Sequence, residues 1–453
     1  MRLTEVAAIT GGTCLGGEAE FTSVSIDSRT LASGDLFFAI PGERFDGHDF
    51  LNQVLAMGAS AAVVQRPVAC SLPQVQVADV RRALGQLGAA WRDRFDGRVI
   101  GVTGSNGKTT AKEMIATVLA TDGSVLKTQG NLNNDLGVPL TLLKLRPEHR
   151  YAVIEMGANH GGEIAYVAGL AKPHVGLITN AGSAHLEGFG SVEGVARAKG
   201  EMITSLPVDG VSLLNADDRF FSYWQALAQG RRVISFGFSE GAAVQGLAES
   251  IRIGTGEQGF RTGFDFVYQG VRHEATIGVA GQHNVANALA AIAAGLALGL
   301  GMDRIIQGLR GVAPVSGRMQ PLRADCGSLV INDTYNANPS SFKAALDVVR
   351  QLPGEPWVAL GAFGELGETS AELHADIGRQ ARDMGVARLF ATGPNADKTV
   401  QTFGAGGTYF ADQDGLIGQL TSELRKDVVV LVKGSRSQRM ERVVEALCRS
   451  ARG

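Results

Sequence analysis

The residues best suited to chemistry form a glycine-rich turn at positions 103–110, which read Thr-Gly-Ser-Asn-Gly-Lys-Thr-Thr. The turn follows an apolar run at 98–102 that predicts a buried strand, and it precedes residues 111–119, whose apolar spacing predicts a helix. In this arrangement backbone N–H groups converge on phosphate oxygens, and the start of the helix favours negative charge. The sequence therefore predicts a phosphate-binding loop.

Two side chains of this loop have separate expected roles. Lys108 would contact the β- and γ-phosphates of a nucleoside triphosphate, and Thr109 would bind Mg²⁺ through its hydroxyl. The loop is a variant, because Val102 stands where the standard pattern has its first glycine. A plain strand-to-helix turn with a surface lysine is the alternative, which the Lys-Thr-Thr ending at a helix start disfavours. The candidate nucleotide ligands are Gly104, Ser105, Asn106, Gly107, Lys108, Thr109 and Thr110.

Other polar residues in the middle of the chain follow apolar strands, which is where open α/β sheets bind ligands. Glu155 lies in the apolar run 151–156, and a carboxylate near Thr109 suits Mg²⁺. His185 follows the next strand, where it is either a metal ligand or, like most lone loop histidines, structural. Lys199 is by composition an ordinary lysine of a helix at 192–203. Beside two magnesium ions it could react with CO₂ to give a carbamate ligand, although nothing in the spacing demands this.

Candidate contacts to the rest of a nucleotide lie later in the chain. His283 and Asn284 open an expected helix and could hold an adenine, with N-capping as the alternative role. Arg318 follows an expected linker at 314–317, and Lys433 and Arg436 follow the last expected strand. These cations could face a triphosphate or a carboxylate across a cleft.

A loop at 332–339, Asn-Asp-Thr-Tyr-Asn-Ala-Asn-Pro, ends a strand with an unusual density of hydrogen-bonding groups. Such a loop is more typical of ligand binding than of stability alone. Its candidate ligand groups are Asp333, Tyr335, Asn336 and Asn338.

Two polar clusters lie near the N-terminus. The first reads Asp27-Ser28-Arg29, and the second, after an apolar strand at 35–40, reads Phe45-Asp46-Gly47-His48. Together they could bind a nucleotide, with the guanidinium on a diphosphate and the hydroxyl or carboxylate on uracil or ribose. A capping aspartate and a solvated arginine explain the first cluster equally well.

The pattern of the whole chain predicts the sheets that would position these residues. A length of 453 residues suggests about three domains, which we place at 1–83, 84–313 and 314–453. The first mixes short strands and helices in a small α/β unit. The second alternates strand and helix, which predicts a parallel sheet covered on both faces, and the third repeats the alternation as a second doubly wound sheet. Expected strands are 98–103, 151–156, 175–180, 210–214, 232–236, 329–332, 357–360, 388–391 and 428–432, with a β-hairpin or small sheet within 251–280.

The composition excludes several classes of protein. Apolar residues make up 45% and charged residues 19%, as in globular proteins, and the net charge of −3 predicts no general affinity for nucleic acid or anionic membranes. The start lacks the apolar core of a signal peptide, and the longest apolar run, 288–300, predicts a buried helix rather than a membrane span. The four cysteines are scattered without metal-type spacing. We therefore expect a cytoplasmic protein with free thiols.

Taken together, these motifs resemble the Mur ligase family, the ATP-dependent amide-forming enzymes of cell-wall precursor assembly. The 103–110 loop matches the family's variant loop, and the resemblance continues in family order over essentially the whole chain. Segments 130–134, 155–160 and 335–339 are most similar to the family member that adds D-alanyl-D-alanine to UDP-N-acetylmuramoyl-tripeptide. Ala362 and Phe363 depart from that pattern, which has an acid and a methionine there.

The resemblance implies a UDP-sugar-binding domain, a central ATPase domain and a C-terminal Rossmann-like domain that binds the incoming amine and part of ATP. It implies ATP and Mg²⁺ as cofactors, with the metal held by Thr109, Glu155, His185 and a carbamylated Lys199. Adenine, ribose and phosphate contacts would come from His283, Asn284, Arg318 and Asp333. The UDP-sugar would bind Ser28, Arg29, Phe45, Asp46, Gly47 and His48, and the dipeptide would bind Tyr335, Asn336, Asn338, Lys433 and Arg436. Lys108, His185, Lys199 and Arg318 would be the catalytic residues.

The implied reaction begins with attack of the tripeptide carboxylate on the γ-phosphate to give an acyl phosphate, from which the dipeptide amine displaces phosphate. Catalysis would rest on positioning and charge neutralisation, and no side chain in these motifs is an obvious nucleophile. The alternatives are a sibling ligase that adds a single amino acid, a folylpolyglutamate synthase-like ligase, and a non-catalytic nucleotide sensor. The two N-terminal clusters weigh against the folate enzyme. We expect a monomer.

Overall fold

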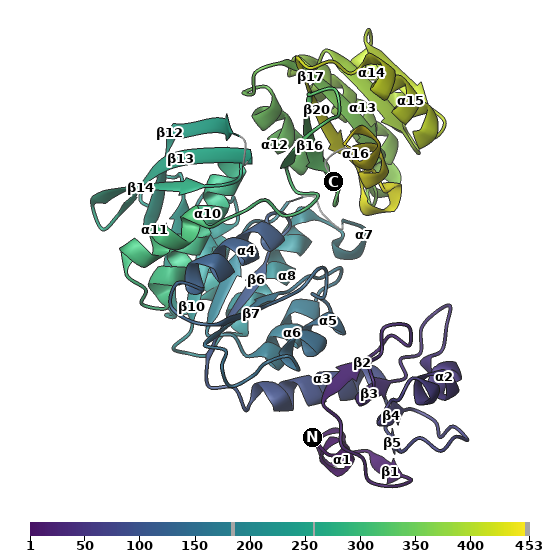
Figure 1. Cartoon of the computed structure of the whole chain (residues 1–453). Helices are drawn as coiled ribbons and strands as arrows, with labels where there is room; N and C mark the ends of the chain where they lie inside the picture. Colours follow the sequence, from purple (N-terminus) through teal and green to yellow (C-terminus); the bar gives the residue numbers. More distant parts are fainter. Residues whose placement is uncertain (183–185, 257–258, 449–453) are drawn as a thin grey trace.

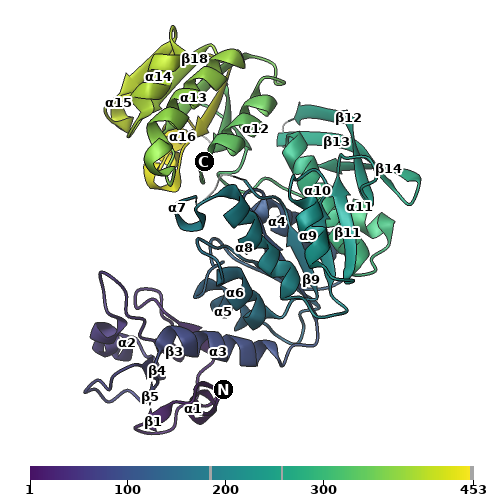
Figure 2. The ribbon, with the colours of Figure 1, turned by 180° about the vertical axis from the view of Figure 1, so that it is seen from behind.

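The computed structural model describes residues 1–182, 186–256 and 259–448. Three sheets with their covering helices form three units in chain order, and the first and last units lie at opposite ends of the middle one (Figures 1 and 2). The predicted fold class, α/β with three units, is confirmed. No helix among the described residues is long and apolar enough to cross a membrane.

The N-terminal unit is a five-stranded sheet in the order β1-β5-β4-β3-β2, in which only β1 is antiparallel to its neighbour. Alternate side chains of β3 face opposite sides: Leu36 and Phe38 pack against α1 and α3, whereas Phe37 packs against α2. The elements are α1 (Leu3–Thr10), β1 (Thr13–Leu15), β2 (Ser23–Ser25), β3 (Asp35–Phe38), η1 (Gly47–Phe50), α2 (Leu51–Ala56), β4 (Ala61–Val64), β5 (Gln74–Gln76) and α3 (Val80–Arg92).

The central unit is a nine-stranded sheet in the order β14-β13-β12-β11-β10-β9-β6-β8-β7. Strands β6 to β12 are parallel, and β13 and β14 extend the sheet beyond β12 in antiparallel pairing. The strands are β6 (Arg98–Thr103), β7 (Val125–Lys127), β8 (Tyr151–Glu155), β9 (Val175–Ile178), β10 (Val211–Asn215), β11 (Arg232–Gly237), β12 (Val244–Gly256), β13 (Gly259–Tyr268) and β14 (Val271–Ile277).

Helices cover both faces of the central sheet. One face carries α4 (Lys108–Leu119), α10 (Gln282–Ala297) and α11 (Met302–Arg310). The other carries α5 (Gly137–Leu142), α6 (Glu163–Ala171), α8 (Val192–Thr204) and α9 (Phe221–Leu227), and α7 (Leu186–Phe189) lies just before α8. The apolar run at 288–300 lies in and just after α10, where residues 288–294 are fully buried, as expected.

The C-terminal unit is a six-stranded sheet in the order β15-β16-β20-β17-β18-β19, with only β15 antiparallel. Its strands are β15 (Gln320–Arg323), β16 (Leu329–Asp333), β17 (Glu355–Gly361), β18 (Arg388–Thr392), β19 (Gly407–Phe410) and β20 (Val428–Lys433). Its helices are α12 (Pro339–Val349), η2 (Gly367–Thr369), α13 (Ser370–Asp383), α14 (Ala396–Phe403), α15 (Gln413–Glu423), η3 (Arg436–Gln438) and α16 (Glu441–Leu447).

Each strand expected from the sequence is present within two residues at either end. The pattern at 251–280 is longer than expected, because its first strand, β12, begins at Val244. The expected division between residues 83 and 84 falls inside α3, whose apolar side chains join the core of the N-terminal unit while α3 also contacts α5 and α6. In the central and C-terminal units, strands β7, β15 and β19 have no counterpart among the expected strands.

Candidate functional site

A cavity of about 900 Å³ lies between the central and C-terminal units. The carboxyl ends of central strands, the start of α4 and the loops after β16 and β20 form its walls. Parallel strands present their carboxyl ends at one edge of a sheet, which is where open α/β sheets bind ligands. The predicted ligands that line it are Ser105, Asn106, Gly107, Lys108, Thr109, Thr110, Glu155, His283, Asn284, Arg318, Asp333, Tyr335, Asn336, Asn338, Lys433 and Arg436. The structure thus brings together most of the predicted ATP, metal and dipeptide residues.

Two glycines give the phosphate loop its shape. Gly104 has φ +145° and Gly107 has φ +80°, both in the region that favours glycine. A Cβ at Gly104 would lie 1.9 Å from Thr179 Oγ1, so the loop packs directly on the end of β9. Lys108 Nζ donates to the carbonyls of Gly104 at 2.6 Å and Ser105 at 3.2 Å, which folds its side chain back over the loop. Burial lowers the pKa of Lys108, and the nearby Glu155 opposes that shift.

The loop after β9 fixes the phosphate loop from the other side. Asn180 accepts the Ser105 N–H through its backbone carbonyl and the Asn106 N–H through Oδ1, each at 2.9 Å. Thr179 Oγ1 and Asn180 Nδ2 both donate to the Asn106 carbonyl. The N–H groups that begin α4 at Lys108 have no partner within a helix, and they are the ones left for phosphate oxygens. Asn180 was missed as a site residue, although its place at the end of an expected strand was a usable signal.

A carboxylate and a hydroxyl in the cavity fit a hard cation. Glu155 is buried, its Oε1 accepts from Asn133 Nδ2 at 3.0 Å, and its Oε2 has no hydrogen-bond partner among the described residues. Lys112 Nζ lies 3.7 Å from that Oε2. Thr109 Oγ1 accepts from Arg318 Nη2 at 2.8 Å. A carboxylate oxygen that accepts no hydrogen bond and a hydroxyl lining the same cavity are oxygen donors of the kind that Mg²⁺ takes. Within the described ranges, no three His, Cys, Asp or Glu residues gather as a metal-binding group.

Lys199 is buried and is not among the residues that line the cavity. Its ammonium lies 5.5 Å from the centre of the Phe189 ring, and its side chain is 2% exposed. Burial lowers the pKa of Lys199 to about 7, with a further contribution from the charge of Lys108. His185 lies outside the described residues.

The two candidate adenine contacts, His283 and Asn284, differ in how many hydrogen bonds their side chains already make within the protein. Asn284 Nδ2 donates to the Ala280 carbonyl at 2.7 Å, and its Oδ1 accepts from Asn287 Nδ2 at 3.3 Å. Its amide therefore serves the first turn of α10, close to the capping role that was the alternative. His283 also lines the cavity, and burial lowers its pKa.

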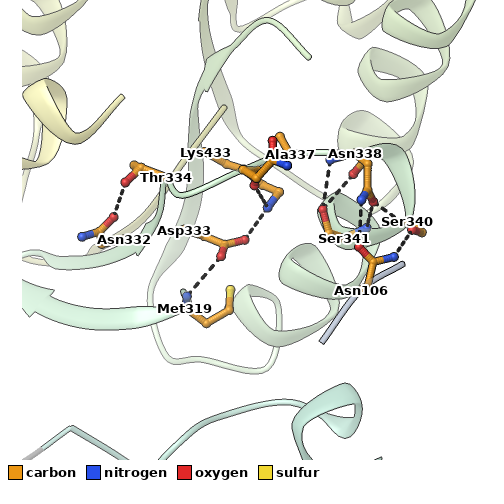
Figure 3. A network of polar contacts seen from close by, with 11 residues as sticks. Asn106, Met319, Asn332, Asp333, Thr334, Ala337, Asn338, Ser340, Ser341 and Lys433 are labelled. Atoms are coloured by element: carbon orange, nitrogen blue, oxygen red, sulfur yellow. Dashed lines mark hydrogen bonds and ion pairs between the residues drawn. The ribbon is translucent and has the colours of Figure 1, made fainter. Parts of the chain in front are cut away.

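Much of the loop after β16 is held by internal bonds (Figure 3). Lys433 Nζ contacts Asp333 Oδ2 at 2.5 Å and donates to the Asn336 carbonyl at 3.1 Å, while Asp333 Oδ1 accepts from the Met319 N–H. Asn338 caps α12 by accepting the Ser341 N–H at 2.9 Å. These side chains therefore have protein partners, and their direct contacts to ligands stay predictions.

One aromatic ring and two guanidinium groups complete this wall of the cavity. The Arg318 guanidinium lies 4.2 Å from the centre of the Tyr335 ring, and that of Arg436 lies 5.9 Å from it. Asn336 Oδ1 accepts from the Ala337 N–H, and its Nδ2 has no hydrogen-bond partner among the described residues.

A second cavity, of about 1660 Å³, lies between the N-terminal unit and the edge of the central one. Of the predicted UDP-sugar residues, Ser28, Arg29, Phe45 and Gly47 line it. The Phe45 side chain is 72% exposed, as suits a stacking surface. Arg94 and Arg146, which sequence reasoning missed, also line it and lie 5.3 and 5.9 Å from the centre of the Trp91 ring.

The other members of the two N-terminal clusters are tied to protein partners. His48 is buried, with its Nδ1 2.5 Å from Asp46 Oδ1 and its Nε2 accepting the Gln65 N–H at 2.9 Å. Asp46 also accepts from Arg66 at 2.8 Å. Arg29 donates to Asp27 at 2.7 Å, and this pairing lowers the pKa of Asp27 to about 2. Several of the predicted UDP-sugar groups in these two clusters therefore form ion pairs within the protein.

Comparison with known proteins places the chain in a family. Family models described as "Mur ligase family, catalytic domain", "Mur ligase middle domain" and "Mur ligase, glutamate ligase domain" match residues 20–92, 102–295 and 317–436. The UDP-N-acetylmuramoyl-tripeptide–D-alanyl-D-alanine ligase of Escherichia coli K12 is 41% identical over 450 residues, which cover 98% of each chain. The chain belongs to the Mur ligase family. The resemblance inferred from the sequence motifs is therefore confirmed, and the protein is a ligase.

Solved structures of Mur ligases agree with the three-unit fold. A crystal structure of MurF from Acinetobacter baumannii is 37% identical, covers 98% of both chains and superposes with a TM-score of 0.90. MurF from Thermotoga maritima, in complex with ADP, is 30% identical, covers 95% of this chain and 98% of the other, and gives a TM-score of 0.83.

Proposed function

We propose that this Mur ligase joins D-alanyl-D-alanine to UDP-N-acetylmuramoyl-tripeptide at the expense of ATP. The observation that carries the proposal is the 900 Å³ cavity, which places a phosphate loop, a partly unpaired carboxylate and an amide-rich C-terminal loop around one space. Relatives that carry this ligase name align over almost the whole chain. The three units would divide the work at about 1–83, 84–313 and 314–453, for UDP-sugar, ATP, and dipeptide with part of ATP.

ATP would bind with its phosphates on the start of α4 and beside Lys108. Mg²⁺ would be held by Thr109 and by Glu155, whose Oε2 is buried without a hydrogen-bond partner among the described residues. When bound, the metal neutralises phosphate charge. Thr109 Oγ1 can accept from Arg318 and still offer a lone pair to the metal, because a hydroxyl oxygen has two.

The chain's own residues would promote the reaction by position and charge. The tripeptide carboxylate attacks the γ-phosphorus of ATP, the bond to the ADP oxygen breaks, and an acyl phosphate forms. The dipeptide amine then attacks the acyl carbon, loses a proton and displaces inorganic phosphate. Lys108 and Arg318 would stabilise the negative charge that passes between these oxygens. Bringing the three substrates into one cavity supplies the positioning.

The UDP-sugar would lie in the second cavity, which Arg29, the exposed Phe45, Arg94 and Arg146 line. Leu132 lines this cavity, while the next two residues, Asn133 and Asn134, line the first. The segment 132–134 therefore borders both spaces, and the peptide of the substrate would cross it to reach the phosphate loop.

Lys199 and His185 would serve a second metal ion, with Lys199 as a carbamate. Carbamate formation needs the neutral amine. With a pKa of about 7, roughly half of the Lys199 side chains are neutral at pH 7, against about 0.03% for an ordinary lysine. We further propose that the protein acts as a monomer, because residues of one chain line both cavities. A cytoplasmic location is proposed with it, because the reaction consumes ATP.

The test is phosphate release by the purified chain with UDP-N-acetylmuramoyl-tripeptide, Mg²⁺-ATP and one amine at a time. D-alanyl-D-alanine is expected to support rapid turnover, whereas meso-diaminopimelate, L-lysine, D-glutamate and single D-alanine are not. A preference for a single amino acid would identify a sibling ligase. ATP binding without phosphate release for any amine would favour the nucleotide sensor.

A further inference from the structure

Three side chains form a closed ring of hydrogen bonds across the cavity (Figure 3). Asn338 Nδ2 donates to Asn106 Oδ1 at 2.7 Å, and Asn106 Nδ2 donates to Ser340 Oγ at 3.0 Å. Ser340 Oγ donates in turn to Asn338 Oδ1 at 2.9 Å. Asn106 belongs to the phosphate loop, whereas Asn338 and Ser340 begin α12 of the C-terminal unit, more than 230 residues later in the chain.

Asn106 is fixed on the central side by its backbone. Its N–H donates to Asn180 Oδ1, and its carbonyl accepts from Thr179 and Asn180. The side chain of Asn106 therefore extends toward the C-terminal unit from a rigid base. A movement of the phosphate loop moves this amide as well.

The C-terminal side of the ring is equally constrained. Asn338 Oδ1 accepts the Ser341 N–H as the cap of α12, so both ends of the Asn338 amide are in use. Five residues earlier, Asp333 is held by Lys433, which also holds the Asn336 carbonyl. The loop 333–338 is thus tied to its own sheet at one end and to the phosphate loop at the other.

We propose that Asn106, Asn338 and Ser340 are a latch that positions the dipeptide-binding loop against the ATP-binding loop. Asn338 and Ser340 are positioning residues in this scheme, acting through loop 333–338 rather than as ligands of the dipeptide. The inference rests on the proposed function, since it takes ATP and D-alanyl-D-alanine as the two ligands. A triphosphate bound on the loop that carries Asn106 would favour the arrangement in which the ring is closed, and the closed ring holds loop 333–338 in place. Binding of the two ligands therefore becomes mutually favourable.

The latch can be removed without removing the helix cap. Serine caps helices as well as asparagine does. It lacks the side-chain NH₂ group that donates to Asn106, so Asn338→Ser removes this contact between the units. Ser340→Ala is a second variant, which removes the hydroxyl that bridges the two amides. Ser341→Ala is the matched control: Ser341 Oγ bonds only to the Asn338 backbone among the described residues, outside the ring.

Isothermal titration calorimetry would measure D-alanyl-D-alanine affinity with and without Mg²⁺ and a non-hydrolysable ATP analogue. The analogue is expected to tighten dipeptide binding to the wild type and to the control, and this gain should shrink about 5- to 10-fold in Asn338→Ser and Ser340→Ala. Steady-state KM for ATP at saturating dipeptide should change less than 3-fold. In a double-mutant cycle, Asn338→Ser should have little further effect once Asn106 is alanine.

Equal gains in wild type and both latch variants would overturn the latch, as would a wild type with no gain at all. Failure of the proposed function looks different: the wild type would neither bind nor consume the dipeptide under any condition.

Discussion

Replacing Lys433 by methionine is expected to destabilise the C-terminal unit, and not merely to weaken dipeptide binding. The Lys433 side chain is 1% exposed, and its ammonium meets Asp333 and the Asn336 carbonyl. In the variant, the Asp333 carboxylate would keep the Met319 N–H but lose its only salt bridge among the described residues. A largely buried charge without a countercharge is the most expensive outcome of such a substitution.

The magnitude follows from that burial. Breaking a buried ion pair by removing one partner costs about 3–5 kcal/mol, a large share of the ~5–15 kcal/mol by which domains are stable. For a domain of this size the unfolding temperature should fall by about 10–20 °C. The double variant Lys433→Met/Asp333→Asn has no buried charge, and its amide can still accept the Met319 N–H. It should therefore recover most of the loss.

Differential scanning calorimetry of wild type, single and double variants would measure the C-terminal unfolding transition. Arg442→Met is the control, because it breaks an exposed ion pair with Asp414 in the same unit and should shift the transition by no more than a few degrees. A Lys433→Met protein that unfolds like the wild type while its KM for the dipeptide rises would refute the anchoring role and support direct ligand binding. A double variant no more stable than the single one would refute the charge argument.

Three further predictions test other parts of the molecule. Lys199→Ala should lose nearly all turnover and regain part of it with short carboxylic acids, and a ¹³C-bicarbonate NMR signal from a carbamate should be present only in the wild type; normal turnover would exclude the second-metal role. Arg29→Ala should raise KM for the sugar nucleotide about 10- to 100-fold more than KM for ATP, whereas Asp27→Asn, which frees the guanidinium, should lower it; unchanged values would remove the UDP assignment. His374 is neutral because its Nε2 accepts the Phe363 N–H, and burial lowers its pKa below 6.5. The free energy of unfolding should therefore fall as the pH drops from about 6.5 toward the pKa of the folded state. Thermal melts of His374→Gln should lack this dependence on pH.

The sequence predicted which residues would meet at one edge of the central sheet because parallel sheets impose a simple rule. Residues at the carboxyl ends of adjacent strands must come together, so Thr103 and Glu155 could be placed at one edge before their register was known. In the structure Val102 pairs with Glu155 and Thr103 with Ile178. Long apolar strands carry this information, whereas β7 and β15 are edge strands of three and four residues, too short to give a pattern.

Partner choice could not be predicted in the same way. Asp333 and Lys433 are 100 residues apart, and they become neighbours only because β16 pairs with β20, which is not its neighbour in the chain. Residue type says that each can form an ion pair or bind a ligand, but not which it does. The same holds for Asn338, whose amide is engaged across the cavity by a loop 232 residues away. The tertiary structure determines these partners, and the spacing of residues along the sequence does not predict them.

Hydrogen-bond capacity separates the anchors of the cavity from the atoms that remain for substrates. A primary amide has two donors and one acceptor oxygen, and Asn338 uses both ends of its amide within the protein. Glu155 Oε2 and Arg318 Nε, in contrast, are buried without hydrogen-bond partners among the described residues, an arrangement that costs free energy unless a ligand completes it. One is an anion and the other a cation, as a metal-bound triphosphate requires. Within this cavity, the buried atoms without hydrogen-bond partners are therefore better guides to the chemistry of the ligase than the full set of lining residues.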